Sequence, residues 1–325
     1  MIVPKYWSES KATTKSGGHQ ITVRRFGWSN ESEADAYEHA NRRLDEALKE
    51  LKETGNVRRI DHKVSYNGSE GVPIREEVVS THQDVVISRN SYGALCLNTP
   101  DVMFADVDLD FSTPTKLVIC VFIITGLLSG AAALVFEFWA LLVAGIIGAL
   151  MFSGSLARFV NQRVFNSEEN IEHQALERIK EVSQRNKSLH MRVYQTTMGF
   201  RVLFMEGTYD PTSEAAAQLL KSIASDRVYI QMCRNQRCFR ARVSPKPWRI
   251  GVGRLRPRPG VWPISPERMQ EREQWVQRYE KKSRHYSTCT FVMKLGADTV
   301  HEKAEHVRKL HDELCKVNEV GAEVV

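Results

Sequence analysis

The chain has 325 residues, with 45 Lys and Arg against 39 Asp and Glu, a formal net charge of +6. This length predicts two or three domain-sized segments, each long enough to bury a core. The six cysteines are sparse and show neither a disulfide framework nor paired CxxC motifs, which excludes a small disulfide-stabilised secreted fold and favours a reducing compartment.

The first part of the chain predicts strands and one helix. Residues 1–30 have an extended pattern, and Ile21–Trp28 alternates apolar and basic side chains as a half-buried strand does. Ser29 or Asn30 is expected to cap a helix that runs to about Lys52, with acids early and bases late, and that ends at Gly55.

Short strand candidates follow this helix, separated by turn signals such as Asn67-Gly68. They are Lys63–Tyr66, Arg75–Ser80, Asp84–Ser88, Ala94–Asn98 and Val102–Asp108. This order is typical of an α+β region rich in antiparallel strands.

Three carboxylates alternate with apolar residues in the segment Phe104–Phe111. In a strand, Asp106, Asp108 and Asp110 point to one face, where they repel each other unless a cation lies among them. Carboxylate oxygens are the ligands that Mg²⁺ and Mn²⁺ prefer, so the segment is a candidate metal site. The alternatives are a solvated strand edge and ion pairs with arginines of the same chain.

Between Leu117 and Ala157, forty-one residues carry a single charge, that of Glu137. The charge separates two runs of twenty uncharged residues, Leu117–Phe136 and Phe138–Ala157. A twenty-residue helix is about 30 Å long, which matches the hydrocarbon core of a bilayer, and only helices satisfy their own backbone there. We therefore predict a transmembrane helical hairpin within residues 116–160.

Basic residues near the hairpin ends predict its orientation. Lys116 precedes the first run, Arg158 and Arg163 follow the second, and the turn carries only an acid. The positive-inside rule then places both termini in the cytoplasm, in a two-span protein of the inner membrane. The chain starts without the apolar region of a cleavable signal, so the first span is expected to direct insertion. Small residues on the spans would allow close approach within the hairpin or in a homo-oligomer, namely Gly126, Gly130, Ala131, Gly145, Gly148 and Ala149.

The part after the hairpin predicts a second α+β region over 161–244. A helix is expected from Ser167 or Asn166 to about Lys187, a strand hairpin over His190–Glu206, a helix after Pro211 and a strand over Asp226–Met232. The order β-β-α-β favours a ferredoxin- or RRM-like sheet packed against helices. Residues 245–325 are expected to form a Pro/Arg-rich arm followed by helices over Pro266–Ser283 and Asp298–Val317. With residues 1–115, these flanks predict one cytoplasmic α+β body interrupted by the hairpin.

A basic stretch lies between Cys233 and Arg258, where nine bases and no acid occur in twenty-six residues. Eight of the nine are Arg, whose planar guanidinium suits phosphate and carboxylate. The candidate anion-binding residues are Arg234, Arg237, Arg240, Arg242, Lys246, Trp248 and Arg249. Three interpretations remain open: a nucleic-acid or nucleotide site, contact with anionic lipid headgroups, and ion pairs with the chain's own acids.

On the last predicted helix, His311 and Cys315 share a face, four residues apart. Two donors without further ligands do not define a metal site, and core or surface positions are the expected interpretation.

Three stretches carry a resemblance to a family of uncharacterised bacterial two-span inner-membrane proteins: TVRRFGWS, RNSYGALCLNTPDVMFADVD and MCRNQRCFRARVSPKPWRIG. A fainter resemblance is to primase-polymerase-type nucleotidyltransferases, which pair an acidic DxD strand with a later Gly-x-His strand on an RRM-like sheet. Asp106 and Asp108 fit the first element, and Gly199-Phe200-Arg201 stands where the second would be. Arg201 in place of the histidine, and the hairpin between the two elements, argue against polymerase activity.

The leading functional hypothesis is a membrane protein whose cytoplasmic body binds an anionic partner through the basic stretch. The first alternative is a metal-dependent phosphoryl- or nucleotidyl-transfer enzyme, with Asp106 and Asp108 on Mg²⁺ or Mn²⁺ and Arg240, Arg242 and Lys246 on phosphates. The second is a non-catalytic scaffold in which acids and arginines neutralise each other.

Overall fold

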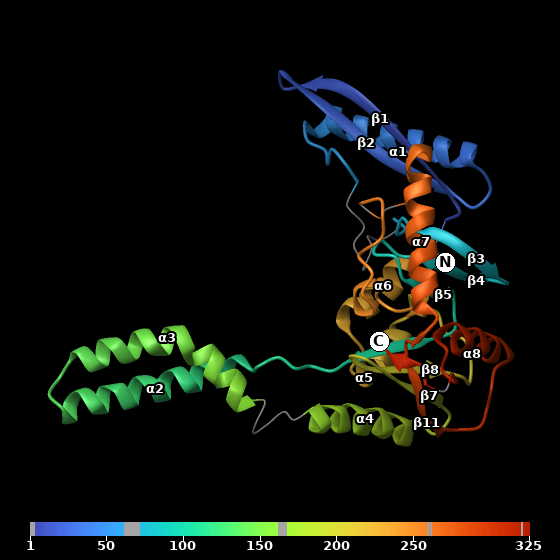
Figure 1. Ribbon diagram of the computed structural model, residues 1–325. Helices are drawn as coiled ribbons and strands as arrows, with labels where there is room; N and C mark the ends of the chain where they lie inside the picture. Colours follow the sequence, from blue (N-terminus) through green and yellow to red (C-terminus); the bar gives the residue numbers. More distant parts are fainter. Residues whose placement is uncertain (1–3, 62–71, 162–167, 259, 261, 320) are drawn as a thin grey trace. The chain divides into compact units, whose positions relative to one another are not determined.

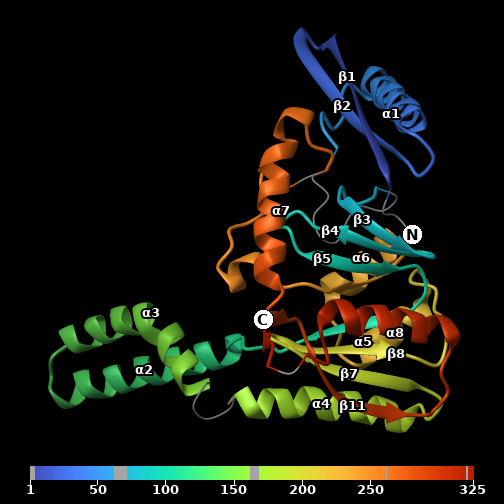
Figure 2. The same cartoon turned by 45° about the vertical axis from the view of Figure 1, so that its right-hand side comes forward.

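A computed structural model describes residues 4–61, 72–161, 168–258, 260, 262–319 and 321–325 (Figures 1 and 2). The chain divides into two compact units. The first, which we call the body, comprises Met1–Val107 and Lys180–Val325. The second, which we call the insertion, comprises Asp108–Ile179. Since the body contains sequence from both sides of the insertion, the two predicted α+β regions form one folded unit.

The body begins with strands and one helix. These are β1 (Tyr6–Ser16), β2 (His19–Ser29), α1 (Glu33–Thr54), β3 (Glu77–His82), β4 (Val85–Arg89), β5 (Leu95–Thr99) and β6 (Phe104–Asp108). After the insertion come β7 (His190–Thr196), β8 (Gly199–Phe204), α5 (Glu214–Ser222), α6 (Arg227–Gln236) and β9 (Phe239–Arg242). The chain ends with the short 3-10 helices η2 (Pro247–Ile250) and η3 (Pro266–Arg268), α7 (Met269–Ser283), β10 (Tyr286–Ser287), β11 (Thr290–Gly296), α8 (Glu302–Cys315) and β12 (Glu323–Val324).

The β1–β2 hairpin and α1 form a small layer of their own, drawn in blue in Figure 1. The helix buries Ala36, Ala40 and Leu44 at helical spacing, and Val23 of β2 lies in the same apolar cluster as Leu44. The Ser32 hydroxyl accepts a hydrogen bond from the Asp35 N–H (3.0 Å), and Gly55 ends the helix in the left-handed conformation. The predicted helix and its end are confirmed, whereas its cap is Ser32 and not Ser29 or Asn30.

The rest of the body is built on two four-stranded sheets, in the orders β3-β4-β5-β9 and β11-β7-β8-β6, beside a short β10-β12 pair. The first sheet takes its last strand from beyond the insertion, where β9 pairs antiparallel with β5. The second takes β6 from before the insertion and the other three strands from after it. The α+β class with antiparallel sheets is therefore confirmed, and the finer ferredoxin- or RRM-like description stays a prediction.

Helix α6 joins the two sheets. The Tyr229 hydroxyl donates to the Phe104 carbonyl (2.9 Å) and accepts a hydrogen bond from the Arg240 N–H (3.4 Å), so it contacts β6 of one sheet and β9 of the other. Figure 2 shows α8 over the sheet that contains β7 and β8, and the ring of His311 on this helix contacts those of Tyr194 and Phe104.

The structure corrects the strand predicted over Asp226–Met232, which is helix α6. The Asp226 side chain caps this helix by accepting from the Tyr229 N–H (2.8 Å), and Tyr229, Ile230 and Cys233 are buried at helical spacing. Apolar runs this short fit a helix or a strand equally well, and here the cap formed by Asp226 favours the helix. Strand β11 was not predicted, and the candidate Lys63–Tyr66 lies outside the described residues.

The insertion contains α2 (Thr115–Val135) and α3 (Ala140–Val160), and α4 (Glu168–Arg185) begins in it and ends in the body. Helices α2 and α3 lie antiparallel beside each other in both views (Figures 1 and 2). Each has twenty-one residues, enough to cross a membrane by length and composition, and within their most apolar windows only 11% and 17% of residues are buried. The two predicted apolar helices are thus present, with ends a few residues from those expected.

Helices α2 and α3 contact each other through small residues. A Cβ atom on Gly145 would overlap the side chain of Ser129 on α2, whereas Gly148 and Gly126 have no heavy atom near the place of a Cβ. Ala133 and Ala149 are buried. Only part of the predicted small-residue set therefore lies between the helices.

Replacing Gly145 by Leu is expected to separate α2 from α3, because the larger side chain cannot fit against Ser129. The full chain in mild detergent should lose thermal stability, and the midpoint of its unfolding should fall by several degrees. Gly148→Leu is the matched control, since it adds the same apolar volume to the same helix where there is space. Equal behaviour of the two variants would contradict the helix contact described above.

Candidate functional site

Asp106 and Arg201 face each other on the neighbouring strands β6 and β8. The Arg201 Nε lies 3.6 Å from the Asp106 Oδ1, and its Nη1 donates to the Arg242 carbonyl (2.9 Å). Arg201 is only 3% exposed. Burial alone would lower the pKa of this arginine, but the carboxylate of Asp106 raises it above its usual value. The positive charge beside Asp106 is therefore supplied by Arg201.

The other two predicted metal ligands, Asp108 and Asp110, belong to the insertion and are exposed. The Asp110 carboxylate accepts a hydrogen bond from the Ser112 N–H (2.8 Å), and hydrogen bonding to Ser112 lowers its pKa. The three carboxylates do not all belong to one compact unit, so the Mg²⁺ or Mn²⁺ site stays a prediction.

The basic stretch is not one surface. Arg240, on β9, is 5% exposed and holds the Glu76 carboxylate through Nη2 at 2.7 and 2.8 Å. Glu76 is itself 4% exposed and accepts a further hydrogen bond from the Ser88 hydroxyl (2.7 Å). Arg242, on the same strand, donates to the Ser244 carbonyl (2.9 Å). For Arg240 the interpretation as an internal ion pair describes the observed geometry.

Lys246, Trp248 and Arg249 lie on or beside η2. The indole of Trp248 is 45% exposed, and its ring contacts that of Tyr92 edge-on at a centroid distance of 5.2 Å. The Lys246 ammonium lies 5.9 Å from the Trp248 ring and the Arg254 guanidinium 5.4 Å from it. Burial lowers the pKa of Arg249 and raises that of Tyr92 to about 12. This group is a cationic aromatic surface, separate from Arg240.

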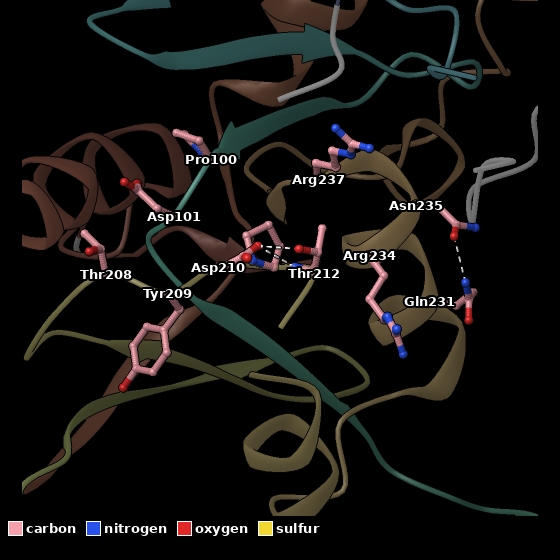
Figure 3. A pocket seen from close by; sticks show the side chains of 11 residues that line it. Pro100, Asp101, Thr208, Tyr209, Asp210, Thr212, Gln231, Arg234, Asn235 and Arg237 are labelled. Carbon is pink, nitrogen blue, oxygen red and sulfur yellow. Dashed lines mark hydrogen bonds between the residues drawn. The ribbon is translucent and has the colours of Figure 1, made fainter. Parts of the chain in front are cut away.

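Arg234 and Arg237 line a cavity of about 990 Å³ at the end of α6 (Figure 3). The remaining wall consists of two loop segments and the polar face of the helix: Pro100, Asp101, Thr208, Tyr209, Asp210, Pro211, Thr212, Gln231 and Asn235. This volume is within the range of pockets that hold small ligands. Hydroxyl, amide and guanidinium groups predominate in the wall.

The acids of this cavity already have partners. Asp101 pairs with Lys303 (2.6 Å), and although burial alone would lower the pKa of Lys303, its hydrogen bonds to Asp101 and Asp84 raise it. The Asp210 carboxylate accepts hydrogen bonds from the Thr212 hydroxyl (2.7 Å) and N–H (2.8 Å), which lower its pKa. Both acids are thus held by neighbours.

The two arginines differ in their pairing. Arg234 has a long contact with Glu214 (3.8 Å), whereas Arg237 makes no ion pair within the part of the chain that the structure describes. In Figure 3 their side chains extend in opposite directions from the end of α6, with Asp210 and Thr212 beside the space between them. The carbonyls of the last helical turn accept from the N–H groups of Arg237 and Cys238, which limits their repulsion of an anion.

Comparisons of the chain with protein-family models, with curated proteins and with solved structures found no match.

Sequence reasoning found the two arginines of the cavity but not its opposite wall. Thr208, Asp210 and Thr212 belong to a loop between β8 and α5 that has no motif of its own. Asp101 comes from a turn in the N-terminal half of the body. Only the pairing of strands from both sides of the insertion brings these segments together, and no local pattern encodes that pairing.

Substituting Arg240 by Met is expected to lower the free energy of unfolding by about 3–5 kcal/mol, because the buried Glu76 carboxylate would lose its partner. The double variant Glu76→Leu with Arg240→Met removes both charges and should recover much of that loss. Chemical denaturation of the full chain in detergent measures both. If the double variant were as unstable as the single one, the ion pair would not be what Arg240 contributes.

Proposed function

We propose that this chain is a two-span protein of the bacterial inner membrane whose cytoplasmic body binds a phosphate-bearing ligand in the cavity of Arg234 and Arg237. The observation that supports this most is the charge distribution at the cavity. Its two acids are held by neighbours, while the guanidinium of Arg237 makes no ion pair with any described residue.

The ligand class follows from the groups in the wall. Guanidinium groups bind phosphate oxygens with two parallel hydrogen bonds, and the Thr208 hydroxyl suits a hydroxyl or ring-nitrogen partner. The amides of Gln231 and Asn235 bond to each other, with the Gln231 Nε2 donating to the Asn235 Oδ1 (2.7 Å). Because the two arginines extend away from each other, one phosphate group would not serve both. An extended ligand with at least two phosphates, such as a nucleotide or a short nucleic-acid strand, fits this arrangement.

The topology proposal rests on the sheets. Strands β6 and β8 belong to one sheet, although α2 and α3 lie between them in the chain. A single sheet cannot be divided by a bilayer, so the chain has to leave the membrane on the side where it entered. Two spans satisfy this condition, and Lys116, Arg158 and Arg163 favour the cytoplasm as the shared side.

Of the alternatives, the internal ion pairs support a structural role for part of the basic stretch. The phosphoryl-transfer hypothesis has less support, because Arg201 lies beside Asp106 and Arg240 is engaged with Glu76. A lipid headgroup carries the same phosphate chemistry as a free ligand, so the groups of the cavity do not distinguish the two. The titrations below distinguish them.

The double variant Arg234→Ala with Arg237→Ala should bind inorganic tripolyphosphate at least about tenfold more weakly than the wild type. A hydrogen bond to a charged group contributes about 1.5–3 kcal/mol, and tenfold in affinity corresponds to about 1.4 kcal/mol. Isothermal titration calorimetry of the full chain in nonionic detergent measures this, and the wild-type affinity should fall as salt is raised.

Arg227→Ala is the matched control, since Arg227 is exposed at the other end of α6 and does not line the cavity. It should bind tripolyphosphate as the wild type does. Soluble dihexanoyl phosphatidylglycerol, titrated in the same way, distinguishes a lipid ligand from a free one. Absence of salt-dependent binding of either probe to the wild type would rule out the proposed function.

Alkaline phosphatase, which is active only outside the cytoplasm, should be active when inserted at Glu137 and inactive when fused to either terminus. Green fluorescent protein, which is fluorescent only in the cytoplasm, should give the opposite pattern. Exchanging the flanking charges, by Lys116→Glu with Arg158→Glu, should reduce the fraction of correctly oriented chains. A terminus found outside the cytoplasm would contradict the argument from the shared sheet.

A further inference from the structure

We propose that Cys289, His311 and Cys315 form a zinc-binding site inside the body. Their ligand atoms, two Sγ and the His311 Nε2, all lie within 4.8 Å of one another. The three residues are at most 1% exposed, and no other group of three such donors lies this close together among the described residues. The site is separate from the cavity of Arg234 and Arg237.

The donor set indicates which metal it suits. Two thiolates and one imidazole are ligands that select Zn²⁺ over Mg²⁺ or Ca²⁺, which prefer oxygen. Zinc bonds of about 2.3 Å to sulfur and about 2.0–2.1 Å to nitrogen place such donors roughly 3.5–3.8 Å apart. The Cys289 Sγ is 4.0 Å from the His311 Nε2 and the three donors lie within 4.8 Å of one another, so closing around a zinc ion requires contractions of up to about 1 Å.

The histidine is oriented for coordination by the residue that follows it. The His311 Nδ1 lies 2.9 Å from the Asp312 Oδ1, which fixes the proton on Nδ1 and turns the Nε2 lone pair toward the two sulfurs. A carboxylate that holds the second nitrogen of a histidine ligand is the usual support for zinc. Asp312 is in turn held by Arg308 (2.8 Å) and Arg192 (3.7 Å), so its position does not depend on His311 alone.

One hydroxyl lies between the backbones of the two cysteines, within hydrogen-bond distance of both carbonyls. The Ser287 Oγ is 2.8 Å from the Cys289 carbonyl and 3.0 Å from the Cys315 carbonyl, and the Thr288 N–H donates to the latter (3.2 Å). These contacts hold the segment before β11 against the end of α8, where Cys315 is the last helical residue. The three donors thus come together through backbone contacts that need no metal.

Arg201 is the neighbour that a cation has to accommodate. Its Nη1 lies 3.2 Å from the His311 Nε2 and 4.0 Å from the Cys315 Sγ. Two thiolates neutralise one Zn²⁺, so binding adds no net positive charge beside the guanidinium. Arg201 would give up its contact with Nε2 while keeping the Arg242 carbonyl and Asp106, and its N–H groups would then face the sulfurs.

Burial assigns the site a structural role. No substrate reaches donors that are 0–1% exposed, so the zinc ion would act as a cross-link between the segment before β11 and α8. The three side chains leave the fourth tetrahedral position to a small ligand such as a water molecule. The sequence contained one sign of it, the pair His311 and Cys315 on one helical face. Cys289 is twenty-two residues before His311, and no spacing rule connects it to the helix.

The test uses the full chain in nonionic detergent, stripped by a chelator under reducing conditions and then incubated with Zn²⁺ and desalted. We expect one zinc ion per chain by elemental analysis and a higher unfolding temperature after loading. Co²⁺ used instead should give the tetrahedral absorption spectrum with sulfur-to-metal charge transfer from two thiolates. This spectrum is recorded on the wild type, so it does not depend on a variant that folds.

Cys289→Ser and Cys315→Ser should each lose zinc, while Cys96→Ser, which removes a buried cysteine elsewhere in the body, should keep one zinc ion per chain. Circular dichroism establishes that each variant compared is folded. The proposal is wrong if the wild type binds neither Zn²⁺ nor Co²⁺, or if folded Cys289→Ser retains its zinc.

Discussion

Buried arginines that need carboxylate partners are the constraint on which the body depends. Arg89, Arg201, Arg240 and Arg272 are each at most 5% exposed. A guanidinium cannot lose its charge at any ordinary pH, so each buried arginine has to bring an acid with it. The observed partners are Glu280 for Arg89, Asp106 for Arg201, Glu76 for Arg240 and Glu77 for Arg272.

These pairs connect parts of the chain that are far apart in sequence. Glu76 and Arg240 are 164 residues apart, and Glu77 and Arg272 are 195 apart. A wrong strand pairing would leave a charge without its partner in the interior, at a cost of several kcal/mol. The ion pairs therefore disfavour alternative arrangements of the two sheets more than they add to the stability of the native one. The same requirement separates the bases of the basic stretch into two groups, because a base that forms an ion pair inside the body is not available to bind a ligand.

Local patterns allowed much of the fold to be predicted, and the failures have physical reasons. The two apolar helices, α1 with its end at Gly55, and the β7–β8 hairpin follow from periodicity and turn chemistry. The strand predicted over Asp226–Met232 failed because a single capping hydrogen bond decides between helix and strand in so short a run. In the candidate site, Arg234 and Arg237 could be predicted because a basic stretch without acids can be identified in a sequence. The burial of Arg240 could not be predicted, since its partner Glu76 is distant in the chain and resembles any exposed acid.

The position of the insertion has a consequence for how the protein is made. Before α2 is synthesised, β3, β4 and β5 can pair locally, but β5 lacks β9 and β6 lacks β8. Both sheets thus stay incomplete until the chain beyond α3 emerges. The ion pairs Glu76–Arg240 and Asp106–Arg201 cannot form before then either. On the proposed topology, the two spans enter the bilayer while the N-terminal half of the body still has open strand edges. Completion of the body then requires both flanks on one side, so a chain that inserted only one span could not complete either sheet. On this topology, folding of the body would depend on correct membrane insertion, and a misinserted chain would expose β5 and β6 to aggregation or proteolysis.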